Sequence, residues 1–327
     1  MPFDSSLKNS LGTIGSLDEN LKECYEYYWN SGQSHFFFRN GVGSVHCRSF
    51  LKEKNRYLLI ILPGRSEASI KYSELCFELQ GIGFDLVVFD HRGQGFSERT
   101  GNKGNLNHIN SWHEYVGDVL SISEHFKEQK EYKKTVVLGH SLGGALSLAS
   151  QIRDSYFSDA LILSSPMLCI SPFKIPNFIS KVALFILSQM GMRNSSTSLY
   201  RGQNCKGSFI ENNLTSSLER YQFSLELKKR HPQIEVGAPT VQWLYEMSKL
   251  KSYIWNKKSH LDCAVLMMQA GQDRVVSNVA QEKYFDKVTN CRILKLKESM
   301  HEIFQERDDI RNRALVQVHK FLKEIKK

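Results

Sequence analysis

The chain has 327 residues, of which 41% are hydrophobic and 24% are charged. This composition is typical of a globular protein with enough apolar material for a sizeable core, and it excludes extensive disorder. The formal net charge of +9 does not select a partner, since basic proteins bind nucleic acid, anionic membranes or neither.

The amino-terminal segment MPFDSSLKNS lacks the basic and apolar regions of a secretion signal. No run of about 18 apolar residues occurs, so no membrane-spanning helix is expected. The seven cysteines are scattered, without a C-x-x-C pair or metal-ligand spacing. We therefore expect a cytoplasmic protein with reduced thiols that needs no metal and no organic cofactor.

The first half of the chain alternates between strand-like and helical stretches. Residues 17–29 predict a helix, and the stretches SHFFFR and SVHCRSF that follow predict antiparallel strands. The next elements are strands at 57–63, 84–90 and 135–140 and helices at 69–80, 111–130 and 142–153. Short Val, Ile and Leu runs between helices predict an α/β fold with a mostly parallel sheet and helices on both faces.

This alternation stops after a further apolar run at 159–167 and resumes only at 263–270. We therefore predict an insertion at 169–258, between a first part of the core at 1–168 and a second part at 259–327. The second part continues with a helix at 278–287, a strand at 291–297 and a final helix from about 309 to 325.

The pattern G-x-S-x-G occurs at Gly139-His140-Ser141-Leu142-Gly143. It forms a sharp strand-to-helix turn that presents a serine hydroxyl at the edge of a parallel sheet, and its glycines avoid clashes in the turn. The bare pattern also arises by chance as a structural turn. Here it follows an apolar strand and precedes a helix of small residues, so we predict that Ser141 is a nucleophile.

A serine nucleophile needs a base that takes its proton and a third group that orients the base. In this type of fold the acid and then the histidine follow the serine along the chain. Asp273 follows the strand at 263–270 and His301 follows the strand at 291–297. A lone Asp or His in a loop is usually only solvated. The position and order of these two predict that His301 is the general base and that Asp273 orients it.

Acyl transfer also needs N–H donors for the oxyanion, one directly after the nucleophile and one after an early strand. The candidates are the backbone N–H groups of Leu142 and Arg65, the latter following Pro63-Gly64. The sequence Asp90-His91-Arg92-Gly93-Gln94-Gly95 contains G-x-G but lacks the third glycine and the helix of a nucleotide-binding turn. We interpret it as a structural turn beside the site.

Several stretches carry a family resemblance that spans roughly residues 20–325. They lie at 62–99, at GHSLGGA (139–145), SSPML (164–168), VGAPTVQWLYE (236–246), QDRVV (272–276) and MHEIFQE (300–306). These stretches resemble the bacterial lysophospholipase L2 family, within the serine hydrolases that include the monoacylglycerol lipases.

The resemblance implies an α/β-hydrolase fold with a mainly helical cap and hydrolysis of the fatty-acyl ester of lysophospholipids, with acyl transfer to another lipid as an added activity. It also implies a peripheral place on the inner face of the bacterial inner membrane. Pro63-Gly64 departs from the His-Gly of monoacylglycerol lipases. Two alternatives stay open: a monoacylglycerol lipase or general carboxylesterase, and a non-catalytic lipid-binding protein on the same fold.

The insertion at 169–258 holds thirteen Lys and Arg, five Glu and no Asp, so it carries +8 of the net +9. One apolar stripe at helical spacing is formed by Phe178, Val182, Phe185, Ile186 and Met190. The stripe either packs on the core or contacts lipid. We predict that Phe178, Phe185 and Trp243 contact a single-chain acyl ester and that the basic cap contacts an anionic membrane. No nucleic-acid-binding motif is present, so no nucleic-acid partner is expected.

Overall fold

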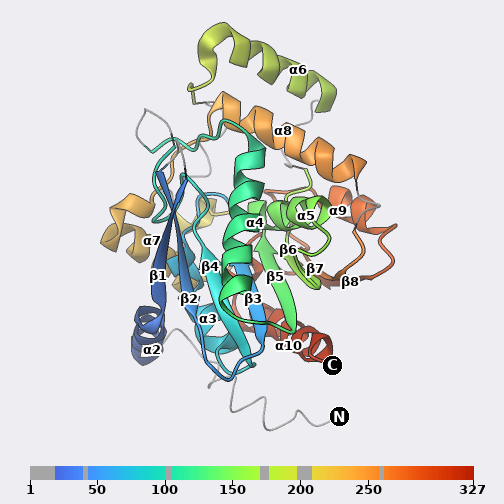
Figure 1. Ribbon diagram of the computed structural model, residues 1–327. Helices are drawn as coiled ribbons and strands as arrows, with labels where there is room; N and C mark the ends of the chain where they lie inside the picture. The colour runs from blue at the N-terminus through green and yellow to red at the C-terminus, as the bar shows by residue number, and fades with distance from the viewer. Residues whose placement is uncertain (1–18, 40–42, 101–104, 170–176, 197–207, 258–260) are drawn as a thin grey trace.

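The computed structural model describes residues 19–39, 43–100, 105–169, 177–196, 208–257 and 261–327. A single sheet of eight strands runs through the molecule (Figure 1). The strands are β1 (Gln33–Arg39), β2 (Gly43–Phe50), β3 (Tyr57–Leu62), β4 (Phe84–Phe89), β5 (Lys134–His140), β6 (Ala160–Ser164), β7 (Ala264–Ala270) and β8 (Cys291–Leu296).

The spatial order of the strands is β1-β2-β4-β3-β5-β6-β7-β8. Strand β2 is antiparallel to both β1 and β4, whereas all pairs from β4 across to β8 are parallel. This confirms the predicted mostly parallel sheet with an antiparallel lead-in. The carboxyl ends of β3, β5, β7 and β8 share one edge, so the loops that follow them meet there.

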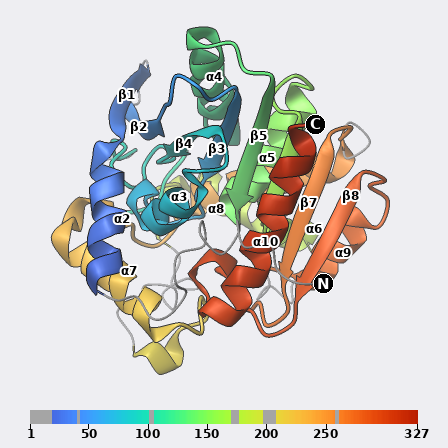
Figure 2. The same ribbon diagram turned by 90° about the horizontal axis from the view of Figure 1, so that it is seen from below.

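Helices cover both faces of the sheet, as predicted (Figure 2). The helices of the core are α2 (Glu19–Ser31), α3 (Ser73–Leu79), α4 (Trp112–Gln129), α5 (Leu142–Arg153), α9 (Asn278–Phe285) and α10 (Asp308–Ile325), with short 3-10 turns η1 (Ser69–Tyr72) and η7 (Ile303–Gln305). The helix predicted at 69–80 is thus a 3-10 turn followed by an α-helix.

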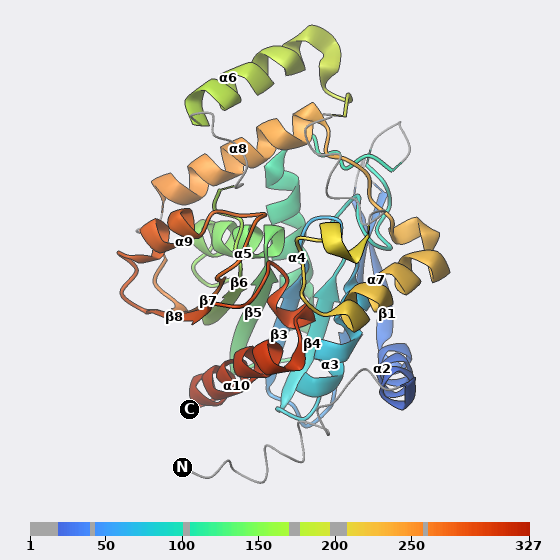
Figure 3. The same cartoon turned by 180° about the vertical axis from the view of Figure 1, so that it is seen from behind.

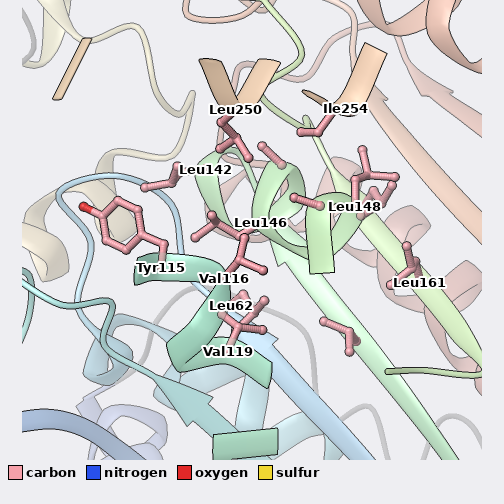
Figure 4. Packing of buried hydrophobic residues seen from close by; sticks show 14 of the residues in the cluster. Leu62, Tyr115, Val116, Val119, Leu142, Leu146, Leu148, Leu161, Leu250 and Ile254 are labelled. Carbon is pink, nitrogen blue, oxygen red and sulfur yellow. The ribbon is translucent and has the colours of Figure 1, made fainter. Parts of the chain in front are cut away.

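Alternate residues of the central strands enter two separate cores, because successive side chains of a strand point to opposite faces. Leu58, Ile60 and Leu62 pack with α4 and α5, whereas Leu59 and Ile61 pack with α3 and α10. Figure 4 shows the first core. All five side chains are fully buried, so the strand that precedes the loop of Arg65 is held rigidly from both sides.

The predicted insertion contains the remaining helices. They are α6 (Asn177–Leu187) with a π-helical turn η2 (Ser188–Met192), η4 (Phe209–Glu211), α7 (Leu218–Arg230), η5 (Pro232–Ile234) and α8 (Val241–Asn256). Helices α6 and α8 lie over the carboxyl edge of the sheet, and α7 lies at the side of the molecule near α2 and α3 (Figure 3). Leu250 and Ile254 of α8 reach into the first core above α5 (Figure 4). Helix α6 lies on the outer side of α8 (Figures 1 and 3). None of the described helices is long and apolar enough to cross a bilayer.

Candidate active site

Ser141 lies in the sharp turn between β5 and α5, at the carboxyl edge of the sheet. Its backbone has φ 49° and ψ −110°, a conformation that L residues rarely adopt. A side chain at Gly143 would collide with the carbonyl oxygens of Leu62 and Pro63, and one at Gly139 would collide with Ser147. The turn therefore needs both glycines, and it holds Ser141 in a strained position that is usual for functional residues.

Two backbone hydrogen bonds fix this turn to the neighbouring strand. The Ser141 N–H donates to the Ser164 carbonyl at 2.9 Å, and its carbonyl accepts from the Met167 N–H at 2.9 Å. Ser141 is only 6% exposed, and this residual surface opens into a cavity.

The structure brings His301 and Asp273 together from loops 28 residues apart in the chain. His301 Nδ1 lies 2.7 Å from Asp273 Oδ2. The other carboxylate oxygen, Oδ1, accepts the N–H groups of Val275 at 2.8 Å and Val276 at 2.9 Å. Burial raises the pKa of Asp273, but the histidine and the two amides outweigh it and hold this pKa below its usual value. An ionised Asp273 accepts the Nδ1 proton, which leaves Nε2 as the basic nitrogen.

Ser141 and His301 line the same cavity, and the rings of His140 and His301 lie 4.8 Å apart. Within the described part of the chain, no hydrogen bond joins the Ser141 hydroxyl to the imidazole. Such bonds are commonly long in unliganded enzymes and tighten when substrate binds.

The loop after β3 passes close to Ser141 and is pinned on both sides of Arg65. The N–H of Gly64 donates to Glu67 at 2.5 Å, and the N–H of Ser66 donates to Gln94 at 2.6 Å. The Leu142 N–H lies in the first turn of α5, where amides have no acceptor within the helix. Both predicted oxyanion donors therefore belong to rigid backbone at this edge of the sheet.

The predicted structural turn at 90–95 does lie beside the site. Gln94 accepts the Ser66 N–H, and His91 Nε2 lies 2.9 Å from the Pro63 carbonyl.

His140 lies directly before Ser141 and is buried. Burial is the main reason that its pKa falls to about 4, so His140 is neutral at pH 7. A neutral His140 adds no charge that would compete with His301 for the Asp273 carboxylate.

The structure contains a buried ionic cluster next to His301 that the sequence did not predict. Lys71 Nζ lies 2.7 Å from both Glu67 and Glu302, and Tyr72 donates to Glu67 at 2.6 Å. Lys71 and the two carboxylates line the cavity. The cluster links the loop of Arg65 to the loop of His301, because Glu302 directly follows the histidine. No local motif marks this cluster, since its members come from opposite ends of the chain.

The insertion is hydrogen-bonded to the same histidine loop. The Glu302 N–H donates to the Leu214 carbonyl at 2.8 Å, and the Thr215 hydroxyl donates to the Gln305 carbonyl at 2.5 Å. Glu306 accepts the N–H of Met300 at 2.6 Å through one carboxylate oxygen. Its other oxygen accepts both the N–H and the hydroxyl of Ser216. The segment before α7 therefore supports the loop that carries His301.

The three residues predicted to contact substrate lie in different places. Trp243 is 1% exposed, lines the cavity and donates to the Tyr115 hydroxyl at 3.2 Å. Phe185 is 45% exposed on α6, packs near Tyr245 with 5.8 Å between ring centroids, and is not part of the cavity wall. The side chain of Phe178 lies outside the described residues. Among the described residues, no three metal-ligating side chains gather.

The cavity combines this polar edge with apolar walls. Its apolar lining residues are Ala68, Met167, Leu214, Leu227, Ile234, Trp243, Val275 and Val276. Its empty space, including solvent at the open mouth, is about 1110 Å³. Such a cleft suits a ligand that has both an apolar chain and a polar group.

Known proteins match this chain over most of its length. The family model of the serine aminopeptidases, S33, matches residues 53–308. Lysophospholipase L2 of Escherichia coli strain K12 is 30% identical over 284 residues, which cover 84% of this chain and 83% of the relative. Human monoglyceride lipase is 32% identical over 124 residues, 37% of this chain and 38% of that protein.

Solved structures share the fold at low sequence identity. A soluble variant of monoglyceride lipase from Saccharomyces cerevisiae, in complex with a substrate analog, has a TM-score of 0.70 at 15% identity and covers 90% of this chain and 95% of that one. A carboxyl esterase from Bacillus coagulans has a TM-score of 0.72 at 17% identity, with 90% and 98% covered. The chain therefore belongs to the serine aminopeptidase S33 family of α/β-hydrolases and is a relative of lysophospholipase L2.

Proposed function

We propose that the chain is a serine hydrolase that cleaves the fatty-acyl ester of lysophospholipids, with Ser141, His301 and Asp273 as its catalytic residues. One observation carries this proposal. Ser141, on its strained turn, and the His301–Asp273 pair line a single cavity with apolar walls. The likeness to lysophospholipase L2 over 84% of the chain supports the choice of substrate.

In the proposed reaction, Ser141 Oγ attacks the acyl carbonyl carbon while His301 Nε2 takes its proton. The hydrogen bond between Ser141 Oγ and His301 Nε2 that this transfer needs forms when substrate binds. Asp273 stabilises the resulting imidazolium, and the imidazolium then gives the proton to the departing alcohol oxygen. Water, activated by the same imidazole, attacks the acyl-enzyme and releases the fatty acid.

The backbone N–H groups of Leu142 and Arg65 are proposed to bind the oxyanion of the tetrahedral intermediate. Donors fixed before the reaction starts are effective because they need no reorganisation as charge develops. The hydrogen bonds of Gly64 to Glu67 and of Ser66 to Gln94 provide this rigidity on the side of Arg65.

The reaction is tested by comparing a lysophospholipid with a monoacylglycerol of the same chain length. We expect faster hydrolysis of the lysophospholipid, labelling of Ser141 by a fluorophosphonate, and a loss of at least ~10³-fold in kcat for Ser141→Ala. Ser121→Ala, at an exposed serine of α4, is the matched control. If Ser141→Ala keeps its activity or the fluorophosphonate does not react, the chain is not this hydrolase.

A monoacylglycerol lipase is the second candidate, because part of the chain is similar to human monoglyceride lipase. Pro63, which stands where monoacylglycerol lipases have histidine, argues against it. Faster turnover of the monoacylglycerol in the same comparison would select this second candidate.

The exposed side of α6 is proposed to contact the surface of an anionic membrane. Val182, Phe185 and Ile186 are 40%, 45% and 50% exposed, and Met190 beyond the helix is 70% exposed. Apolar side chains on a basic insertion fit an interface of acyl chains and anionic headgroups. We expect binding to vesicles that contain phosphatidylglycerol, with affinity that falls as salt rises. If the protein binds neutral vesicles equally well and salt does not change this binding, the Lys and Arg residues of the insertion do not contribute to membrane affinity.

A further inference from the structure

Among the residues that the structure describes, three cations line the cavity beside Ser141: Arg65, Lys71 and Lys228. Two carboxylates of the same described lining, Glu67 and Glu302, bring the formal charge of that lining to +1 when both histidines are neutral. A cavity with apolar walls and a net positive charge favours a ligand that carries an apolar chain and an anion.

The two carboxylates are both engaged by one of these cations. Lys71 is 2.7 Å from Glu67 and 2.7 Å from Glu302, and its side chain is only 12% exposed. A cation that is already shared by two carboxylates contributes little attraction to a third anion. Lys71 is therefore a structural cation of the cavity wall.

Arg65 is also held by its neighbours. Its guanidinium lies over the ring of Trp243 at 5.8 Å, and Nη1 donates to the Gly237 carbonyl at 3.5 Å. These contacts keep the guanidinium against the insertion at the wall of the cavity.

Lys228 differs from both, because no carboxylate of the described residues forms an ion pair with it. It is half-buried and lies in the last turn of α7, next to Lys229 and Arg230. Three cations in this turn outweigh the partial negative charge at the end of a helix. Arg230 points its charge elsewhere, since it pairs with Glu26 at 2.6 Å.

The position of Lys228 is fixed by the helix that carries it. Tyr221, Ser224 and Lys228 are spaced three and four residues apart, so they share the face of α7 that lines the cavity. Leu227, one residue before, is buried in a small apolar cluster with Ala68 and other residues. The ammonium group is thus carried by a helix packed beside the oxyanion loop.

We propose that Lys228 binds the phosphate of a lysophospholipid whose acyl ester lies at Ser141. This inference rests on the proposed function and names the group that recognises its headgroup. Lys228 and Ser141 line the same cavity, and glycerol joins the phosphate to the ester, so one bound lysophospholipid brings both of its groups into this cavity. Lys228 is therefore a specificity residue, which distinguishes a phosphate-bearing substrate from a neutral monoacylglycerol.

Binding of chain-matched ether lipids tests this site without any hydrolysis. One lipid carries a glycerophosphoglycerol headgroup and the other is a plain alkylglycerol, each titrated calorimetrically below its critical micelle concentration. We expect Lys228→Met to raise the Kd of the phosphate lipid by about 10- to 100-fold, the loss of one charged hydrogen bond. Lys228→Arg should retain most of the affinity, and Lys229→Met, at the exposed neighbour, is the matched control.

Three outcomes would overturn the site. In the first, Lys228→Met weakens binding of the alkylglycerol as much as binding of the phosphate lipid, which shows that Lys228 has a purely steric role. In the second, Lys228→Met changes neither affinity. In the third, glycerol 3-phosphate without a chain binds as tightly as the phosphate lipid, which shows a site for soluble phosphate. If Lys228→Met weakens binding of the phosphate ether lipid as expected but the protein hydrolyses no lysophospholipid ester, the proposed reaction is wrong and the phosphate site at Lys228 is retained.

Discussion

Helices α6 and α7 belong to the same insertion but make different contacts: α7 is joined to the core by buried ion pairs, whereas α6 packs only on another helix of the insertion among its main contacts. Arg220 of α7 is 6% exposed and donates two hydrogen bonds to Glu74 of α3, at 2.9 and 2.7 Å. It also bonds Asp308 and the Glu306 carbonyl, both at 2.6 Å. Helix α6 packs on α8, which itself belongs to the insertion, and leaves Ile186 half exposed.

The difference shows that the two helices suit different tasks. A helix tied to the core by buried charges keeps its side chains in register with the site, whereas a helix with an open apolar side is suited to an external surface. This difference supports the proposals that α7 recognises the headgroup and that α6 contacts a membrane.

The largest expected effect comes from breaking the attachment of α7. Arg220→Met leaves the buried Glu74 without one of its two guanidinium partners, and removing one member of a buried ion pair costs about 3–5 kcal/mol. Denaturant unfolding measures this loss. Arg230→Met, also on α7, removes an exposed ion pair with Glu26 of α2 and should lower the free energy of unfolding by less than about 1 kcal/mol. Equal losses of stability in the two variants would show that Arg220 is not the residue that attaches α7 to the core.

A smaller effect is expected on the acid side of the stability profile. Burial raises the pKa of Glu74, but Arg311 and Arg220 outweigh it and hold this pKa below the usual 4.5. The ionised carboxylate therefore contributes stability above pH 4.5, and this contribution is lost as the pH falls through the lowered pKa. The free energy of unfolding of the wild type should fall more steeply below pH 4.5 than that of Arg220→Met. Parallel profiles would show that Arg220 does not control Glu74.

The smallest effect on stability is expected on α6. Replacing Val182 and Ile186 by serine removes apolar side chains that are already 40% and 50% exposed, so unfolding should change by less than about 1 kcal/mol. Binding to phosphatidylglycerol vesicles should weaken in the same variant. Tyr27→Ser, which removes an 81% exposed aromatic side chain from α2 without changing the charge, is the control. A large loss of stability without loss of vesicle binding would reverse the roles of the two helices.

The sequence predicted the core well because its elements have strong local signals. The runs at 57–63 and 135–140 are mostly apolar, and the structure confirms both as central parallel strands. The loops at the ends of β7 and β8 were expected to bring Asp273 and His301 to one edge, and they meet there at 2.7 Å. Parallel strands make this possible, since position along the chain fixes which edge a loop occupies.

Other parts of the site had no local signal. Lys71 and Glu302 are separated by most of the chain, and each alone has the pattern of a solvated surface residue. The apolar stripe of α6 left packing and lipid contact equally open, because periodicity identifies an apolar face but not what covers it. The structure places α6 on α8, and Phe185, which was predicted to contact the substrate, is not part of the cavity wall.

The hydrogen bonds between Leu214–Ser216 and the loop of His301 have a consequence for protein engineering. A cap exchanged between relatives to alter substrate choice would normally be cut where the insertion meets the sheet. Here such a graft would also remove the carbonyl of Leu214 and the hydroxyl of Thr215, which brace the imidazole loop from above. A productive chimera must therefore keep this short bracing segment from the recipient, even when every helix around it is replaced.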